Sequence, residues 1–97
     1  MNYSFHDLAA GDVIAAQDYY LQNAGSAVAK RFTNELDRVI QLLLVNPGFG
    51  TPAAKHRRSY PLKDFPFSLI YQIEGEQLRI LVVRHQRQRP SFGSSRH

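Results

Sequence analysis

The strongest constraint on the fold lies between residues 67 and 83, where two apolar runs flank a short polar turn. Apolar side chains recur at every second position of the first run: Phe67, Leu69, Tyr71 and Ile73. Glu74-Gly75-Glu76 supplies a turn, and an apolar, β-branched run follows at 78–83. This pattern predicts a β-hairpin. Its second strand is apolar on both faces from Ile80 to Val83, which predicts a central strand that is covered on at least one side.

The second strand continues into residues 84–90, a segment too densely charged to be buried. It carries one imidazole and three guanidiniums: Arg84, His85, Arg87 and Arg89. The charge is uneven along the whole chain, because residues 1–46 have a net charge of −2 and residues 47–97 a net charge of +6. The basic half predicts an anionic partner, either nucleic acid or an acidic polypeptide. A solvated basic face without a partner is the alternative.

The length of 97 residues suits one domain with one core. The absence of cysteine excludes disulfides and thiolate metal sites, and we expect neither a metal nor another cofactor. The chain begins without a basic and apolar leader, and its longest purely apolar run is Leu42 to Val45. That run is too short to span a membrane. We therefore expect a cytoplasmic protein with no membrane contact.

Two helices are predicted in the first half of the chain. After a short strand at residues 2–6, with Asp7 as a helix cap, residues 8–23 carry an apolar stripe at helical spacing: Ala9, Val13, Ala16 and Tyr20. Tyr19 and Tyr20 are expected to pack between helix and sheet, with a hydroxyl at the rim. The second helix has a clearer stripe and ends at Asn46-Pro47-Gly48: Ala29, Phe32, Leu36, Val39 and Leu43. The short link between them predicts an αα-hairpin that covers a sheet.

Residues 47–56 have the composition of a loop, and a further strand is predicted from Arg57 to Lys63. Pro61 cannot donate a hydrogen bond to a neighbouring strand, which places this strand at an edge of the sheet or beside a bulge. The predicted order is therefore β-α-α-β-β-β. The fold class is α+β, with an N-terminal αα-hairpin packed on one face of a mainly antiparallel sheet. Residues 1–92 form the domain, and residues 93–97 are predicted to be a flexible tail.

The order of elements and several local patterns resemble the RelE/ParE superfamily of toxins from type II toxin–antitoxin modules. The resemblance covers nearly the whole chain and includes these groups: Asp18-Tyr19-Tyr20, Ala29-Lys30-Arg31-Phe32 with Glu35-Leu36, Asn46-Pro47-Gly48-Phe49-Gly50, Arg58, Leu62, Phe65-Pro66-Phe67, Tyr71, and the ending His85-x-Arg87-x-x-Pro90-x-Phe92. The family's usual ending has two adjacent arginines and often Tyr-Trp after the proline. Here Gln88 and Phe92-Gly93 stand at those positions.

The resemblance implies a growth-inhibiting toxin with a cognate acidic antitoxin as its partner. Superfamily members either cleave mRNA on the ribosome or inhibit DNA gyrase, so the target is the ribosome and its mRNA or gyrase. Whether the chain is an enzyme, an endoribonuclease, stays open at this point. A non-toxic, basic nucleic-acid-binding module is the alternative function.

Cleavage of RNA needs a proton acceptor, a proton donor and cations beside the phosphate. The candidate catalytic residues are His85, Arg87 and Arg58, which we expect on one open surface beside the helices. The candidate binding residues are Lys55, His56, Arg57, Arg84 and Arg89. Against catalysis, residues 47–60 contain no carboxylate, and Phe92 stands nearest to the tyrosine that some ribonuclease members use. His85 has an alternative role, which is to satisfy a backbone group at the end of its strand.

Overall fold

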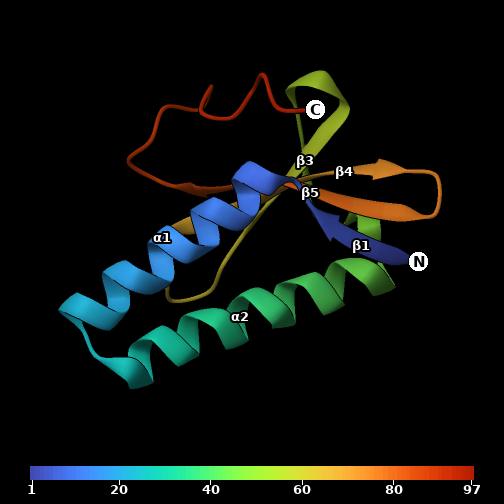
Figure 1. The fold of residues 1–97 in the computed structure, drawn as a ribbon. Coiled ribbons are helices and arrows are strands. Elements are labelled where there is room, and N and C mark those ends of the chain that lie inside the picture. Colours follow the sequence, from blue (N-terminus) through green and yellow to red (C-terminus); the bar gives the residue numbers. More distant parts are fainter.

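The computed structural model describes residues 1–97 as one α+β domain (Figure 1). In chain order the helices and strands are β1 (Asn2–Phe5), α1 (Asp7–Asn23), α2 (Ser26–Val45), β2 (Thr51–Ala53), β3 (Arg57–Pro61), β4 (Phe67–Glu74) and β5 (Gln77–His85). Two 3-10 turns, Pro47–Phe49 and Ala54–His56, flank β2. The predicted fold class, with its N-terminal helical hairpin, is confirmed.

The five strands form one sheet in the order β1-β5-β4-β3-β2. β1 runs parallel to β5, and the other three pairs are antiparallel. The predicted hairpin is present as β4 and β5, with a bulge between Ile70 and Tyr71. β5 lies between β1 and β4, as its apolar run predicted, and its central residues are fully buried.

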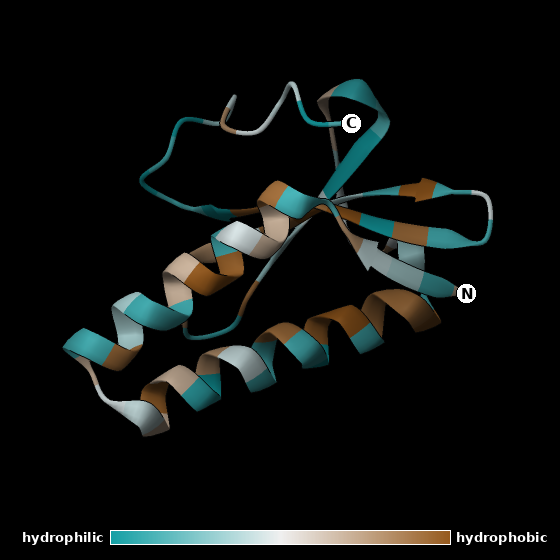
Figure 2. Cartoon of the chain, in the orientation of Figure 1, coloured by the Kyte–Doolittle hydropathy of each residue, from teal (hydrophilic) through white to brown (hydrophobic).

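The two helices lie together on one side of the sheet (Figure 1). Brown and teal segments alternate along α2 because one side of this helix is apolar and the other is polar (Figure 2). The apolar side supplies Phe32, Leu36, Val39 and Leu43 to the core, together with Ile40. α1 begins one residue earlier than expected, and its cap is His6 instead of Asp7. The His6 ring nitrogen Nδ1 accepts a hydrogen bond from Leu8 N–H at 3.0 Å.

A cluster of four aromatic rings joins the helices to the sheet. Phe32 of α2 lies 5.3 to 5.4 Å, between ring centroids, from Tyr20, Phe65 and Phe67. Most of these rings meet edge to face, the geometry that aromatic quadrupoles favour. The cluster fixes the loop before β4 against both helices, and so positions the start of β4 beside the end of α1.

Two details of the sheet differ from the prediction. The stretch predicted to be a loop contains the three-residue edge strand β2, which pairs with Arg57, Arg58 and Ser59. As a result, β3 is an internal strand and not an edge strand. Pro61 is tolerated because it is the last residue of β3 and lies beyond the residues that pair with β2.

Residues 93–97 lie against the outer face of the sheet, the face away from α2 (Figure 1). Arg96 forms an ion pair with Asp12 of α1, in which Nη1 and Oδ2 are 2.6 Å apart. Gly93 lies directly over the buried side chain of Val82. Residues 93–97 therefore contact the domain, in part through an ion pair between residues 12 and 96 that local sequence patterns do not indicate, and their flexibility stays a prediction.

Candidate functional site

A cleft of about 630 Å³ opens between α1, the loop before β4 and the end of β5. Its walls come from these three parts of the chain: Asp12, Ala15, Ala16, Tyr19, Tyr20, Pro66, Phe67, Val83, His85, Gln86, Arg87 and Gln88. The floor is apolar and the rim is polar. The cleft contains two of the three predicted catalytic residues, His85 and Arg87.

His85 is held by contacts on both its ring and its backbone. The ring lies edge to face against Phe67, with centroids 5.0 Å apart. Its Nδ1 accepts a hydrogen bond from Arg87 N–H at 3.0 Å, and its own N–H donates to Gln88 Oε1 at 2.9 Å. Because Nδ1 is occupied as an acceptor, Nε2 is the ring atom that remains to meet a ligand. Beside it, the exposed Arg87 brings a positive charge to the rim.

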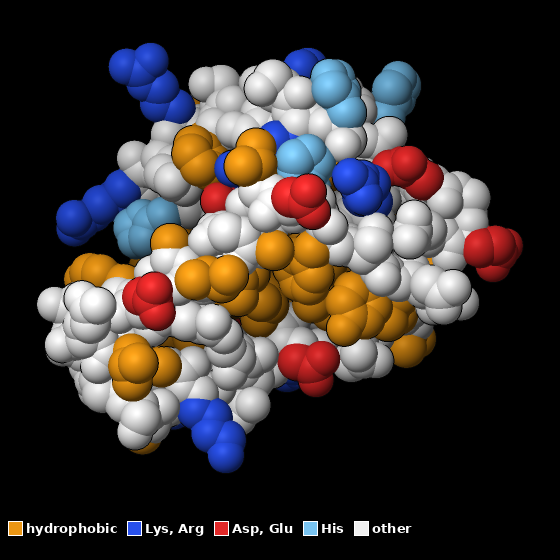
Figure 3. Space-filling view, viewed as in Figure 1, with side chains coloured by type: hydrophobic (Ala, Val, Ile, Leu, Met, Phe, Trp, Pro, Cys, Tyr) orange, Lys and Arg blue, Asp and Glu red, His pale blue; other side chains and the backbone are white.

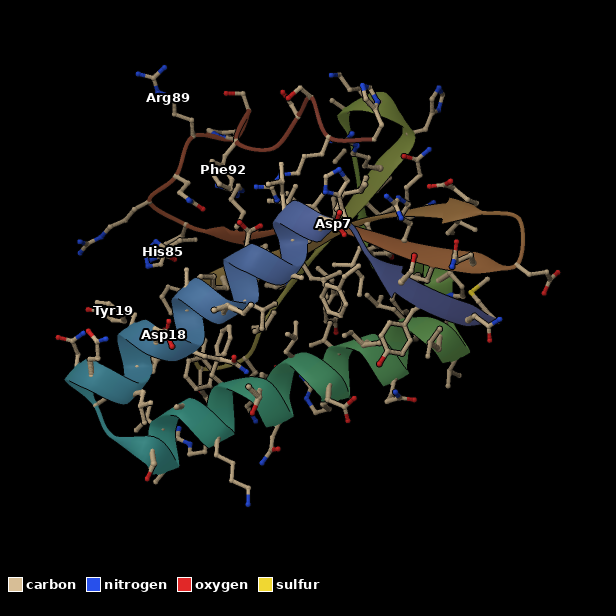
Figure 4. All side chains as sticks on the ribbon, viewed as in Figure 1. Asp7, Asp18, Tyr19, His85, Arg89 and Phe92 are labelled. Carbon is tan, nitrogen blue, oxygen red and sulfur yellow. The ribbon has the colours of Figure 1, made fainter.

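Tyr19 and Asp12 also line the cleft but were not predicted as site residues. Tyr19 was expected to pack between helix and sheet with a hydroxyl at the rim, yet the residue is 61% exposed. It lies at the mouth of the cleft, on the same side of the molecule as His85 (Figure 4). Only Tyr20 packs inward. Its burial is the main cause that raises the pKa of its hydroxyl, and the neighbouring Tyr19 hydroxyl is a smaller cause in the same direction. Helical periodicity separates these two tyrosines, because the predicted stripe contains Tyr20 and excludes Tyr19.

Arg84 and Arg89 do not line the cleft. Arg84 pairs with Ser68, whereas His85 pairs with Phe67, so Arg84 points to the outer face of the sheet. Its Nη1 donates to the carbonyl oxygen of Gln88 at 2.9 Å, which stabilises the turn after β5. Arg89 points away from the domain into solvent (Figure 4).

Arg58, the third predicted catalytic residue, lies in another part of the sheet. Arg58 of β3 pairs with Tyr71 on one side of β4, and His85 of β5 pairs with Phe67 on the other side of β4. The backbone positions of Arg58 and His85 are therefore separated by about 13 Å along β4 and about 10 Å across the sheet. Arg58 Nη1 donates to the carbonyl oxygens of Gly50, at 2.7 Å, and Gly48, at 3.4 Å. The structure therefore brings His85 and Arg87 together but not Arg58.

The other predicted binding residues lie on the outer face, near residues 93–97. Arg57 is buried, with an exposed fraction of 6%, and donates to the carbonyl oxygens of Gly93 and Arg96. Lys55 Nζ donates to the carbonyl oxygen of Ser94 at 2.7 Å, and His56 is exposed. These residues form a second basic region that is separate from the cleft.

Figure 3 shows that basic and histidine side chains gather around the upper half of the molecule, while apolar side chains fill the hollow between the helices. No group of three or more histidine, aspartate or glutamate side chains is placed to hold a metal ion. Neither helix has the length and apolar character that a membrane span requires.

A family model described as the ParE toxin of the type II toxin–antitoxin system parDE matches residues 3–90. The chain belongs to the ParE toxin family. The fold agrees with a solved structure titled a chromosomal ParDE toxin–antitoxin system from P. aeruginosa, at a TM-score of 0.77 and 25% identity, over 88% of this chain and 95% of that one. A search among curated proteins finds no match.

The resemblance to the RelE/ParE superfamily is thus confirmed, and this ParE-family chain is a type II toxin whose partner is an antitoxin. The cytoplasmic location and the roles of the individual site residues stay predictions.

Proposed function

We propose that this ParE-family toxin arrests growth by binding and inhibiting DNA gyrase, and that it does not cleave mRNA. The main support is the distance between Arg58 and His85, which leaves the cleft with one imidazole and one neighbouring guanidinium. Inhibition by binding needs a complementary surface but no general acid or base. An apolar cleft with an exposed tyrosine and arginine at its rim suits such a contact, because these residue types dominate binding hot spots.

RNA cleavage by 2′-hydroxyl attack would require a base, an acid and cations around one phosphate. The only carboxylate of the cleft, Asp12, already accepts hydrogen bonds from Arg96 and from Val83 N–H at 3.0 Å. Arg58 is held by backbone carbonyls far from the imidazole. These contacts favour the gyrase mechanism over the nuclease mechanism.

We further propose that the antitoxin contributes an acidic segment. The support is the net charge of +6 on residues 47–97 and the exposure of basic side chains such as Arg87 and Arg89. Opposite charges would speed association and favour the correct partner.

The decisive test compares both targets with one protein preparation. Purified toxin should block supercoiling by gyrase, and primer extension on mRNA from cells that express it should show no codon-linked cuts. Addition of the antitoxin should restore supercoiling. Codon-linked cuts with normal supercoiling would contradict the proposal, and normal growth at good soluble expression would instead support the non-toxic binding module.

Substitution of His85 separates proton transfer from binding. For a binder, His85→Gln should change gyrase inhibition by less than about tenfold, because loss of one contact is worth on the order of 1 kcal/mol. Loss of a general acid or base would lower activity by about 100-fold to 10,000-fold. Tyr19→Ala should weaken inhibition more than Leu21→Ala, since both residues are exposed on α1 and only Tyr19 lines the cleft.

A further inference from the structure

Arg57 is a buried positive charge without a negative partner. It is 6% exposed, and no carboxylate lies within ion-pair distance of it. Its two terminal nitrogens donate to the carbonyl oxygens of Gly93 and Arg96, and its Nε is buried without any partner. Buried guanidiniums are normally paired with an anion, because neutral carbonyls offset only part of the loss of hydration.

The surroundings of Arg57 add further positive charge. Lys55 Nζ donates to the carbonyl oxygen of Ser94 at 2.7 Å, so a main-chain oxygen again takes the place of an anion. Arg96 itself brings a guanidinium to the same face, and only Asp12 neutralises it. Residues 93–97 therefore cover a group of cations that repel one another.

The turn that leads into Arg57 is strained. Lys55 and His56 both have φ of 61°, the left-handed region that non-glycine residues rarely adopt. Backbone strain of this kind often accompanies sites where function requires a fixed geometry. Here the strained turn places Lys55 and Arg57 under the same four residues of chain, 93–96.

We propose that Arg57 and Lys55 form a phosphate-binding site that residues 93–97 close. Guanidinium forks bind phosphate through two parallel hydrogen bonds, which here replace those to the Gly93 and Arg96 carbonyls. The phosphate group is either a free ion or part of a nucleic-acid backbone. The site lies on the outer face of the sheet, and it is independent of the cleft and of the gyrase proposal.

Gly93 offers a way to open the site without a change in charge. Its φ is +75°, and an added Cβ would lie 2.5 Å from Val82 Cγ2, so Gly93→Ala should release the cover. Gly75→Ala is the matched control, because Gly75 also has a positive φ, of +59°, but has no atom within 4 Å of an added Cβ.

The test is a calorimetric titration of the full chain with inorganic phosphate, at constant ionic strength set with chloride. Gly93→Ala should bind phosphate at least about tenfold more tightly than the wild type, because the cover no longer competes for Arg57. Gly75→Ala should bind as the wild type does, and adding Arg57→Gln to Gly93→Ala should abolish the gain. Equal affinities for the two glycine variants, or a gain that survives Arg57→Gln, would overturn the proposal.

The same variants titrated with a short DNA duplex distinguish the two sources of phosphate. If Gly93→Ala raises the affinity for the duplex and Arg57→Gln removes that gain, the ligand is a nucleic-acid backbone. If the variants change only the affinity for inorganic phosphate, the ligand is a free ion. If Gly93→Ala fails to fold by circular dichroism, Arg96→Gln takes its place. That variant frees the same segment from Asp12 and must meet the same criterion.

Discussion

The hydroxyl of Tyr71 ties the sheet to the turn after α2 through two hydrogen bonds. It accepts a hydrogen bond from Gly50 N–H at 2.9 Å and donates one to Pro47 O at 2.6 Å. Tyr71→Phe should lower the free energy of unfolding by about 1 to 3 kcal/mol, because two backbone groups lose their partner in a buried place. Urea denaturation of both proteins measures the difference.

The pKa of Tyr71 adds a pH signature to this prediction. Burial raises the pKa of its hydroxyl above the ordinary value of 10.0. Its contribution to stability is therefore complete below that value and is lost as the pH rises through the higher pKa of the folded state. The difference in free energy of unfolding between the wild type and Tyr71→Phe should therefore decrease in that alkaline range. A difference that stays constant there would contradict a raised pKa for Tyr71.

Glu35 makes the corresponding link at the other end of the sheet, between α2 and the turn after β3. Its carboxylate accepts hydrogen bonds from Arg38 Nε, at 2.7 Å, and from Lys63 N–H, at 2.6 Å. The hydrogen bond from Arg38 is the main cause that holds the pKa of Glu35 below its usual range, and that from Lys63 acts in the same direction.

Glu35→Gln should therefore destabilise the domain by about 1 kcal/mol at neutral pH. A lowered pKa contributes stability above the unfolded value of about 4.3, and this contribution disappears as the pH falls through the folded pKa. Melting curves from pH 7 to pH 3 should show the two proteins converging. Asp37→Asn serves as the control, because Asp37 is exposed on the same helix.

At this scale the sequence predicted residue types better than their grouping. His85 and Arg87 are close because only Gln86 separates them in the chain, and they do share a cleft. Whether Arg58 joins them depends on the pairing register of β3 and β4. Nothing in the local pattern of residues 57–63 sets that register, because it depends on the loop and turn that flank the strand.

At the scale of the elements, the aromatic cluster packs the helix hairpin against the sheet. Phe32 is fully buried and touches rings from α1, from the loop before β4 and from β4 itself. Phe32→Ala should lower the free energy of unfolding by about 3 to 5 kcal/mol, because it removes this contact and leaves a cavity. Phe49→Ala should cost far less, since Phe49 is 51% exposed, and denaturant titration of the two variants makes the comparison.

The elements themselves were largely predictable, since α2, β4 and β5 carry strong periodic patterns. β2 was missed because it is three exposed residues long and contains Pro52, so it has neither an apolar alternation nor the usual strand composition. Because β2 was not predicted, β3 was predicted to be an edge strand. The position of residues 93–97 was also missed, because it depends on the distant contact between Arg96 and Asp12.

For the whole molecule, the uneven charge leads to a prediction about the antitoxin. The association rate constant should fall by about tenfold or more from low to high salt, because attraction to a basic surface is screened. Arg87→Gln should reduce this salt dependence, whereas Lys30→Gln, in the half of the chain that is acidic overall, should change it less. Stopped-flow mixing with the purified antitoxin gives the rates. A rate constant unaffected by salt would rule out an electrostatically steered encounter.

The parallel pairing of β1 with β5 also has a consequence for how the toxin is made. Asn2–Phe5 are synthesised first, yet their hydrogen-bonding partners are Gln77–Ile80. During translation the apolar sides of both helices stay uncovered until the β4–β5 hairpin has left the ribosome. The cleft between α1 and β5, which includes residues 85–88, therefore forms only after almost all of the chain has been synthesised.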